Sequence, residues 1–356
     1  METRKLSSQS SAVLNAIRAI SAQAVVIGHG ISFTGIALSL HQPNFPWMQN
    51  IAVLVFFILS GCLITYSLLN KQQATSNKQY TYKHYFIDRF SRIYTTFIPA
   101  VIFVVIIDFL SKYINSSGYR YDEAFNIKTF LGNILMLQDF PFISFVTSFG
   151  SARPFWTLAI EWWIYIFVGA VFFIFKRDKI SWLDLIFLGF VSLVPLFNLF
   201  YGRGNGLFMY WLFGALVVFI WQADFLTKLS TCKKTIILFL TIILAAVVVT
   251  KTMKEYEPVF ALLLALAILL SIDLASKLNV PKWFDVSSSY FASYSYTLYL
   301  IHYSIFDFLT VKYGGGFFVF LLGFVIANII AAILGYFFDE RGARYVRKKA
   351  YKYLNL

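Results

Sequence analysis

The sequence predicts an all-α fold, a polytopic membrane bundle of about ten transmembrane helices with both termini cytoplasmic. Hydrophobic residues make up 59% of the 356 residues, and the mean hydropathy is +0.70. Charged residues make up only 13%, whereas soluble domains carry about 25%. This composition excludes an ordinary water-soluble protein, and we expect residues 1–356 to form a single integral membrane domain.

Ten apolar stretches have close to the roughly 20 residues that a helix needs to cross the hydrocarbon core of a bilayer. They lie near residues 13–38, 50–70, 93–111, 156–175, 182–200, 207–221, 235–250, 258–274, 290–310 and 317–337. Arg18 interrupts the first stretch and no small-residue cleavage site follows, so we expect a retained helix and not a signal peptide.

The positions of the basic residues predict the orientation. With the N-terminus inside, 21 Lys and Arg residues fall in inner segments and eight fall in outer segments. The positive-inside rule therefore places both termini in the cytoplasm. The same rule accounts for the net charge of +13, so we expect membrane lipids and no nucleic acid as partners.

Two connecting segments are long enough, and apolar or amphipathic enough, to form helices of their own. The outer segment 112–155 is long and contains an apolar patch, so we expect a short surface or re-entrant helix at 126–137. The inner segment 71–92 starts polar and ends amphipathic, as an interfacial helix leading into the next span would.

The first span carries two ionisable residues, Arg18 and His29, which the bilayer makes costly and therefore marks as functional candidates. Eleven residues of helix bring both side chains to one face, about 16.5 Å apart along the axis. An imidazole can take a proton from a hydroxyl, and an arginine can bind the phosphates of an anionic donor. The alternative is a snorkelling arginine and a hydrogen-bonded core histidine.

The fourth span begins with a second candidate, Glu161, which could orient the His29 imidazole or bind a sugar hydroxyl. A structural ion pair with Arg153 is the equally weighted alternative. Trp156 lies nearby and could stack on a sugar face, although interfacial tryptophan belts are common in membrane proteins.

Two further polar groups complete the candidates. Arg89 and Arg92 are helical neighbours that could grip a phosphate, against the alternative that they only set the topology. In the ninth span, His302 follows Tyr299 by three residues and forms a polar stripe, which could instead serve as packing between helices.

The four histidines, at positions 29, 41, 84 and 302, do not form a metal-binding motif. We therefore expect no metal and no bound cofactor. His41 lies in the outer HQPNFPW loop, where we expect it to be exposed to solvent.

Several stretches in the correct order resemble acyltransferase family 3, the bacterial integral membrane O-acyltransferases. Arg18 and His29 reproduce the family's R-x10-H spacing, and the similarity covers nearly the whole chain. The other matching stretches are VFFILSGCLI at 55–64, FIDRFSRIY at 86–94, WTLAIEWWIY at 156–165 and SYTLYLIHYS at 295–304.

The resemblance implies transfer of an acyl group, usually acetyl, from cytoplasmic acyl-CoA to a glycan hydroxyl at the outer face of a bacterial inner membrane. Acetyl-CoA would be a donor substrate, and the acceptor would be O-antigen or another cell-surface or lipid-linked polysaccharide. His29 would be the catalytic base or the acyl-carrying residue, Glu161 a site residue and Arg18 a donor-side residue. Ser60, in the motif at 55–64, is a further candidate.

The chain departs from the family pattern at three positions. Trp162 stands where the family often has a second glutamate, which puts a two-carboxylate mechanism in doubt. Thr157 replaces a serine but keeps the hydroxyl, and Ser304 stands where a proline is common. Some members add a soluble C-terminal esterase-like domain; we expect none here, so that the membrane domain acts alone.

A transporter or flippase of lipid-linked glycans is the alternative function, because it too would need many spans and buried charges. The sequence lacks the internal repeat and the paired broken helices that are typical of secondary transporters. Acyl transfer is therefore the favoured interpretation.

Overall fold

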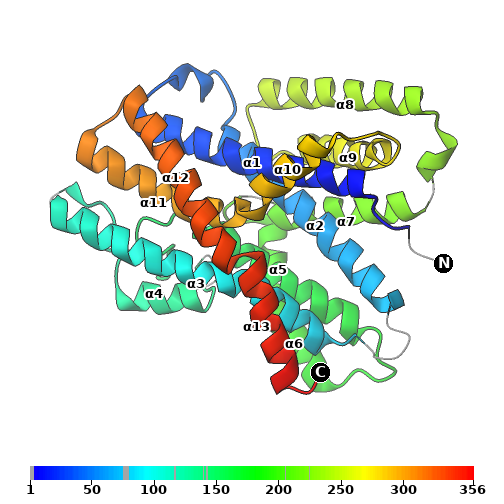
Figure 1. Ribbon diagram of the computed structural model, residues 1–356. Helices are drawn as coiled ribbons and strands as arrows, with labels where there is room; N and C mark the ends of the chain where they lie inside the picture. The colour runs from blue at the N-terminus through cyan, green and yellow to red at the C-terminus, as the bar shows by residue number, and fades with distance from the viewer. Residues whose placement is uncertain are drawn as a thin grey trace. The chain divides into compact units, whose positions relative to one another are not determined.

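The computed structural model describes residues 4–74, 80–115, 118–138, 140–141, 143–204, 206–223 and 225–356. Within these ranges the regular elements are helices, and no strand occurs, which confirms the predicted all-α membrane fold (Figure 1). Contacts divide the chain into two compact units, and helix α1 contributes residues to both.

Unit 1 contains the described parts of Met1–Gly28, Ala37–Gln79 and Gly204–Ala292. Its helices are α1 (Ser8–Thr34, of which the last residues belong to unit 2), η1 (Leu38–Leu40), α2 (Met48–Ala74), α7 (Leu207–Gln222), η3 (Phe225–Lys228), α8 (Thr231–Thr252), α9 (Pro258–Ala275) and α10 (Lys282–Ser293). Helix α2 packs along α7, and α9 packs against both α7 and α8.

Unit 2 contains the described parts of His29–Ile36, Tyr80–Arg203 and Ser293–Leu356. Its further helices are α3 (Tyr82–Ile114), α4 (Ile127–Ile134), α5 (Phe155–Ile174), α6 (Trp182–Phe200), α11 (Ser295–Tyr313), α12 (Phe317–Phe338) and α13 (Glu340–Tyr353). Helix α3 is the centre of this unit, since α5, α11, α12 and α13 all pack against it.

Eight helices of the described chain are long and apolar enough to cross a membrane. The predicted ninth span, 290–310, is divided, because α10 ends at Ser293 and α11 begins at Ser295. The predicted interfacial segment 71–92 is not a helix of its own: residues 71–74 end α2, and residues 82–92 begin the continuous helix α3. Residues 75–79 lie outside the described residues. Ten spans and cytoplasmic termini stay predictions.

Two glycines allow α2 and α7 to meet backbone to backbone in unit 1. A Cβ atom on Gly61 would lie 1.9 Å from the carbonyl oxygen of Trp211, and one on Gly214 would lie 1.9 Å from that of Ile58. Small residues that permit such close approach are typical of helix contacts in membranes, where packing and not water drives association. This contact forms the centre of unit 1.

The predicted short helix near 126–137 is present as α4, and its contacts show that the segment folds back along α3. Asn126 caps its start, with its Oδ1 accepting from the Thr129 amide at 2.9 Å. Its last carbonyl, that of Ile134, accepts from the Tyr94 hydroxyl at 2.8 Å. Tyr94 lies 12 residues after the first residue of α3, about 18 Å along its axis, and 20 residues before the last. The segment therefore folds back along α3, and whether it is re-entrant in a bilayer stays a prediction.

Candidate active site

Two histidines from opposite ends of the sequence meet in unit 2. His29 Nδ1 lies 2.9 Å from His302 Nε2, and the two rings stack with their centroids 5.1 Å apart. His302, on α11, is completely buried, while His29, near the end of α1, is half-buried. Arg18 lies three turns earlier on the same helix α1, as the sequence predicts. We call His29 and His302 the histidine pair.

The hydrogen bonds of the histidine pair assign its protons. His302 Nδ1 lies 2.9 Å from the Leu298 carbonyl oxygen, which can only accept, so this nitrogen carries a proton. In a neutral ring, His302 Nε2 is then an acceptor, and His29 Nδ1 must donate to it. For two neutral rings, the remaining nitrogen of His29, Nε2, holds a lone pair and can act as a base.

Glycine and aromatic neighbours hold His29 in place. A Cβ atom on Gly30 would lie 2.8 Å from both the Phe306 and the Phe320 rings, so α1 can approach these rings only with glycine there. Tyr303 meets the His29 ring edge-on, with centroids 5.1 Å apart. Stacking on His302 and the edge contact with Tyr303 orient the His29 ring.

A line of polar side chains extends from the histidine pair between α5 and α11. The Tyr299 hydroxyl lies 2.6 Å from Thr157 Oγ1, and the Tyr165 hydroxyl donates to Glu161 Oε1 at 2.5 Å. Thr157, Glu161 and Tyr165 are four residues apart on one face of α5. Tyr296, one turn before Tyr299, lies within electrostatic reach of Glu161. We call these five residues the polar seam.

Basic residues of α3 lie at the other end of the polar seam. Arg92 forms an ion pair with the buried carboxylate of Asp339 and is also within electrostatic reach of Tyr296. Arg89 lies over the Tyr85 ring at 5.8 Å. The structure thus brings Glu161 and Arg92 to the same group of residues.

The long segment 112–155, which the sequence predicts to be an outer segment, is attached to α11 beyond the histidine pair. Arg120 and the Tyr121 hydroxyl both donate to Asp307 Oδ1, at 2.6 and 3.0 Å. Ser151 Oγ donates to Ser304 Oγ at 2.7 Å, and the Ser151 amide donates to Asp108 Oδ2 at 2.8 Å. These bonds fix the segment close to the site.

Burial and the Asp307 carboxylate raise the pKa of the Tyr121 hydroxyl well above its usual value. Tyr121 therefore remains a neutral donor to Asp307 at physiological pH.

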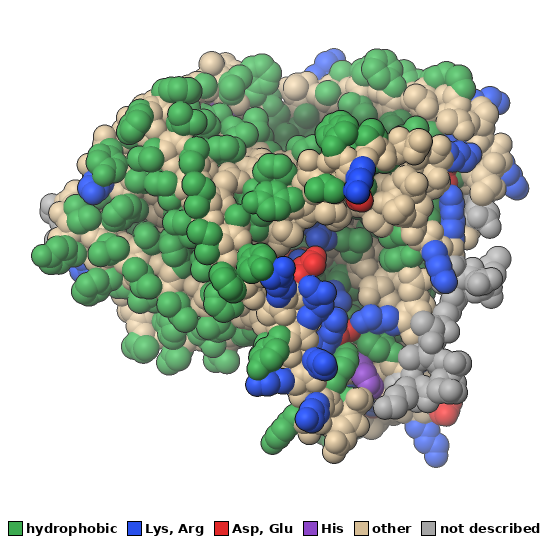
Figure 2. Space-filling view, viewed as in Figure 1, with side chains coloured by type: hydrophobic (Ala, Val, Ile, Leu, Met, Phe, Trp, Pro, Cys, Tyr) green, Lys and Arg blue, Asp and Glu red, His purple; other side chains and the backbone are tan. Residues whose placement is uncertain are grey.

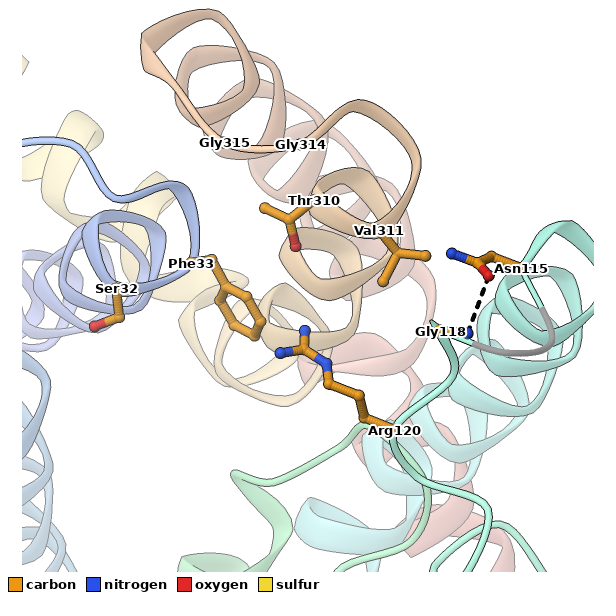
Figure 3. A pocket seen from close by; sticks show the side chains of 9 residues that line it. All are labelled: Ser32, Phe33, Asn115, Gly118, Arg120, Thr310, Val311, Gly314 and Gly315. Atoms are coloured by element: carbon orange, nitrogen blue, oxygen red, sulfur yellow. Dashed lines mark hydrogen bonds between the residues drawn. The ribbon is translucent and has the colours of Figure 1, made fainter.

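A polar cleft of about 410 Å³ opens one turn beyond His29 on α1. Ser32 and Phe33, three and four residues after His29, line it together with Thr310 of α11. Figure 3 shows the Arg120 guanidinium extending toward the Phe33 ring at its side. Because residues three and four apart share a helix face, the cleft lies on the side of α1 that carries His29.

The remaining candidates have other partners. The Trp156 ring lies under the Arg203 guanidinium at 4.5 Å, which is an arrangement the sequence did not suggest. Ser60 Oγ accepts from Trp211 Nε1 at 3.2 Å within unit 1, beside the glycine contact of α2 and α7.

The expectation that His41 is exposed to solvent was wrong. Only 1% of its surface is accessible, and its ring lies 4.4 Å from that of Trp47. Burial lowers the pKa of His41, which favours the neutral ring. The loop folds on its own aromatic residues, a tertiary effect that its polar composition does not reveal.

Two buried carboxylates of the site, Asp108 and Asp307, were missed as candidates. Both lie inside predicted spans, at 93–111 and 290–310, so the rule that selected Arg18 and His29 would also have selected them. Among the described residues, no group of three or more His, Cys, Asp or Glu side chains is arranged to hold a metal ion.

Residues 12–337 match the family described as Acyltransferase domain. The chain belongs to this family. The match confirms the resemblance seen in the sequence and the prediction that the protein is an acyltransferase with several membrane helices.

One relative is the peptidoglycan O-acetyltransferase OatA of Listeria monocytogenes serovar 1/2a (strain ATCC BAA-679 / EGD-e), which is 29% identical over 300 residues. The aligned region covers 76% of this acyltransferase and 47% of the relative. The chain thus matches about half of the relative's length. No solved structure matches the chain.

Proposed function

We propose that this acyltransferase moves an acetyl group from cytoplasmic acetyl-CoA to a sugar hydroxyl of a cell-surface or lipid-linked polysaccharide, in the inner membrane of a bacterium. The observation that carries the proposal is the histidine pair, whose hydrogen bonds place the proton of a neutral His29 on Nδ1 and make Nε2 the basic nitrogen. Membership of the family supports acyl transfer as the reaction. The name of the relative, a peptidoglycan O-acetyltransferase, supports acetyl as the acyl group and a glycan as the acceptor.

In the proposed step, His29 Nε2 takes the proton of the acceptor hydroxyl as its oxygen attacks the thioester carbonyl carbon. The new C–O ester bond forms, the C–S bond breaks, and the coenzyme A thiolate takes the proton back from His29. His302 stabilises the transient positive charge on His29 by accepting from its Nδ1–H. Glu161 contributes negative charge from the polar seam and positions the group.

The donor would enter from the end of the polar seam that carries the basic residues. Arg89 is the strongest phosphate ligand in this proposal, because Arg92 already has the carboxylate of Asp339. Arg18 is assigned to the donor by the R-x10-H spacing. Its axial distance from His29, about 16.5 Å, suits a pantetheine arm that extends along α1.

The acceptor would approach through the polar cleft beyond His29. Serine and threonine hydroxyls, together with an arginine, offer hydrogen bonds to sugar hydroxyls, and the half-buried ring of Phe33 in the lining can contact a sugar ring. A sugar seated there would lie one helical turn from His29, so that a hydroxyl at its inner edge would reach Nε2.

Membranes containing the wild type or His29→Ala, supplied with radiolabelled acetyl-CoA, provide the test. Label is scored separately in peptidoglycan, O-antigen and lipid-linked glycan. We expect label that depends on His29 in one fraction. Retained labelling in a correctly inserted His29→Ala variant would reject this role, and glycan translocation without any label would favour the flippase alternative.

The two possible roles of His29, general base or acyl-carrying residue, differ in whether an acylated protein can be trapped. A base leaves no label on the protein when donor is added without acceptor, whereas an acyl-carrying histidine would retain it after rapid quenching at neutral pH. We expect unlabelled protein, because in the proposed step the acceptor oxygen attacks the thioester carbon directly and no bond forms between His29 and the acyl group.

A further inference from the structure

A second and larger cleft, of about 1130 Å³, opens in unit 2 away from the histidine pair. Tyr94 and Ile98 of α3, Phe337 of α12 and Val346 of α13 line it, together with Leu135 just after α4. Leu135 and Phe337 are each 61% exposed. Sites for drug-sized ligands measure about 300–1,000 Å³, so there is room for a large apolar group.

The helices that form this cleft lie where a bilayer would surround them. Both α3 and α12 belong to segments that are long and apolar enough to cross a membrane. In a bilayer that α3 and α12 cross, hydrocarbon chains would be the medium in contact with the cleft, and water is a poor occupant of an apolar space.

One end of the apolar cleft carries a positive charge. Arg341, the second residue of α13, lines the cleft, and its guanidinium lies 3.7 Å from the centroid of the Tyr336 ring. The ring supports the arginine from one face and leaves its N–H groups directed within the plane. A planar guanidinium with several donors is suited to a phosphate.

Helix α13 strengthens this charge, and Figure 2 shows Lys and Arg side chains gathered on the visible face over it. It has one acidic residue, Glu340, and six basic ones, Arg341, Arg344, Arg347, Lys348, Lys349 and Lys352. The neighbouring carboxylates already have partners: Asp88 accepts from the Tyr351 hydroxyl at 2.8 Å and lies 3.7 Å from Arg347, while Asp339 pairs with Arg92. The charge beside the cleft is therefore positive.

We infer that this cleft binds an anionic phospholipid, with its acyl chains against α3, α12 and the end of α4 and its phosphate on Arg341. An apolar groove in contact with the bilayer that ends at an arginine and a basic amphipathic helix matches the two parts of such a lipid. Basic pockets between helices at the cytoplasmic side are typical sites for anionic head groups. With the predicted cytoplasmic C-terminus, the lipid belongs to the inner leaflet.

A lipid in this cleft would support the segment that contains α4. Ile134 and Leu135 form one wall, and the following residue, Met136, accepts from Trp163 Nε1 of α5 through its carbonyl at 2.7 Å. The same helix α5 carries Thr157 and Glu161 of the polar seam. Occupancy would thus stabilise the loop that packs beside the site, although lipid binding itself requires no acyl transfer.

Native mass spectrometry of the purified full chain in detergent tests this site. Phosphatidylglycerol and phosphatidylcholine with identical acyl chains are titrated separately. We expect phosphatidylglycerol to bind about tenfold more tightly, which corresponds to about 1.4 kcal/mol. Arg341→Gln should reduce the preference to within about twofold, whereas Arg341→Lys should keep most of it.

Arg344→Gln is the matched control, because Arg344 is an exposed arginine on the same helix that does not line the cleft. It should leave the preference unchanged. Ile98→Trp, which fills the apolar part, should weaken both lipids. Melting temperatures of all variants check folding.

Equal binding of the two lipids by the wild type would overturn the inference, as would an equal loss in Arg341→Gln and Arg344→Gln. A dimer that disappears in Ile98→Trp would show that a second copy of the chain occupies the cleft, and would also overturn it.

Discussion

Two helix contacts, one in each unit, carry stretches of the family pattern but are built in different ways. Helix α2 meets α7 through Gly61 and Gly214, and the backbones touch. Helix α11 instead presents His302 to His29 and Asp307 to the long segment 112–155. The first contact is packing, and the second holds polar groups at defined distances.

The comparison shows that a family motif by itself does not identify chemistry. Ser60 and Gly61 belong to one motif, yet Gly61 is needed for close approach, and the Ser60 hydroxyl accepts from a tryptophan. Tyr299 and His302 belong to another, and both face polar partners. We therefore expect substitutions in the first contact to change folding and those in the second to change catalysis.

The largest expected effect is on catalysis. His302→Ala removes the acceptor for His29 Nδ1–H, so we expect acetyl transfer to fall by about 10²–10⁴-fold, the usual contribution of a positioned base. Because His302 is completely buried, the variant also loses packing, and rates are therefore compared per folded molecule. His302→Gln, which can still accept from His29, should recover part of the rate in the radiolabel assay; identical rates for the two variants would contradict the proposed orientation.

Gly61→Leu should reduce folding instead of the catalytic rate of the folded protein. Its side chain would collide with the Trp211 carbonyl, so we expect a loss of stability of at least about 3 kcal/mol and little folded protein. Size-exclusion chromatography with a thermal melt gives the measurement. Gly189→Leu is the control, because nothing lies within 4 Å of a Cβ atom there. A stable but inactive Gly61→Leu protein would contradict the view that the contact of α2 and α7 serves folding and not catalysis.

Asp307→Asn should produce a smaller change on the acceptor side. The amide keeps the shape but loses the charge that holds the partly exposed Arg120, so we expect the acceptor KM to rise about five- to tenfold, or roughly 1–1.4 kcal/mol. Arg120→Gln should match it, and the double variant should be no worse than either. Additive effects, or a change confined to the acetyl-CoA KM, would separate Asp307 from the acceptor cleft.

Ser60→Ala should have the smallest effect. It removes one hydrogen bond from Trp211, worth about 0.5–1.5 kcal/mol of stability, and we expect the specific rate to stay within about twofold of the wild type. Initial rates per folded molecule provide the measurement. A hundredfold loss of rate at unchanged stability would make Ser60 a catalytic residue after all.

Sequence pattern predicted the helices well wherever the apolar stretch was long, and it located α4 within three residues. The prediction of helix ends failed where polar residues lie inside a predicted span. The serines and tyrosines near Ser293 read as part of one helix, although that helix is interrupted between α10 and α11. The burial of His41 against Trp47 also could not be predicted from the sequence, because the solvent exposure of a short loop depends on the residues that it packs against.

What the sequence determined by itself is the membrane class, the all-α fold and the family, because composition, helical length and motif order are local properties of the chain. Only the tertiary structure decided that His29 and His302, 273 residues apart, share a hydrogen bond. It also decided that Arg92 forms an ion pair with Asp339 and that the Ser60 hydroxyl accepts a hydrogen bond from Trp211. Such partners depend on which helices pack together, and that is decided by close contacts such as those at Gly30 and Gly61.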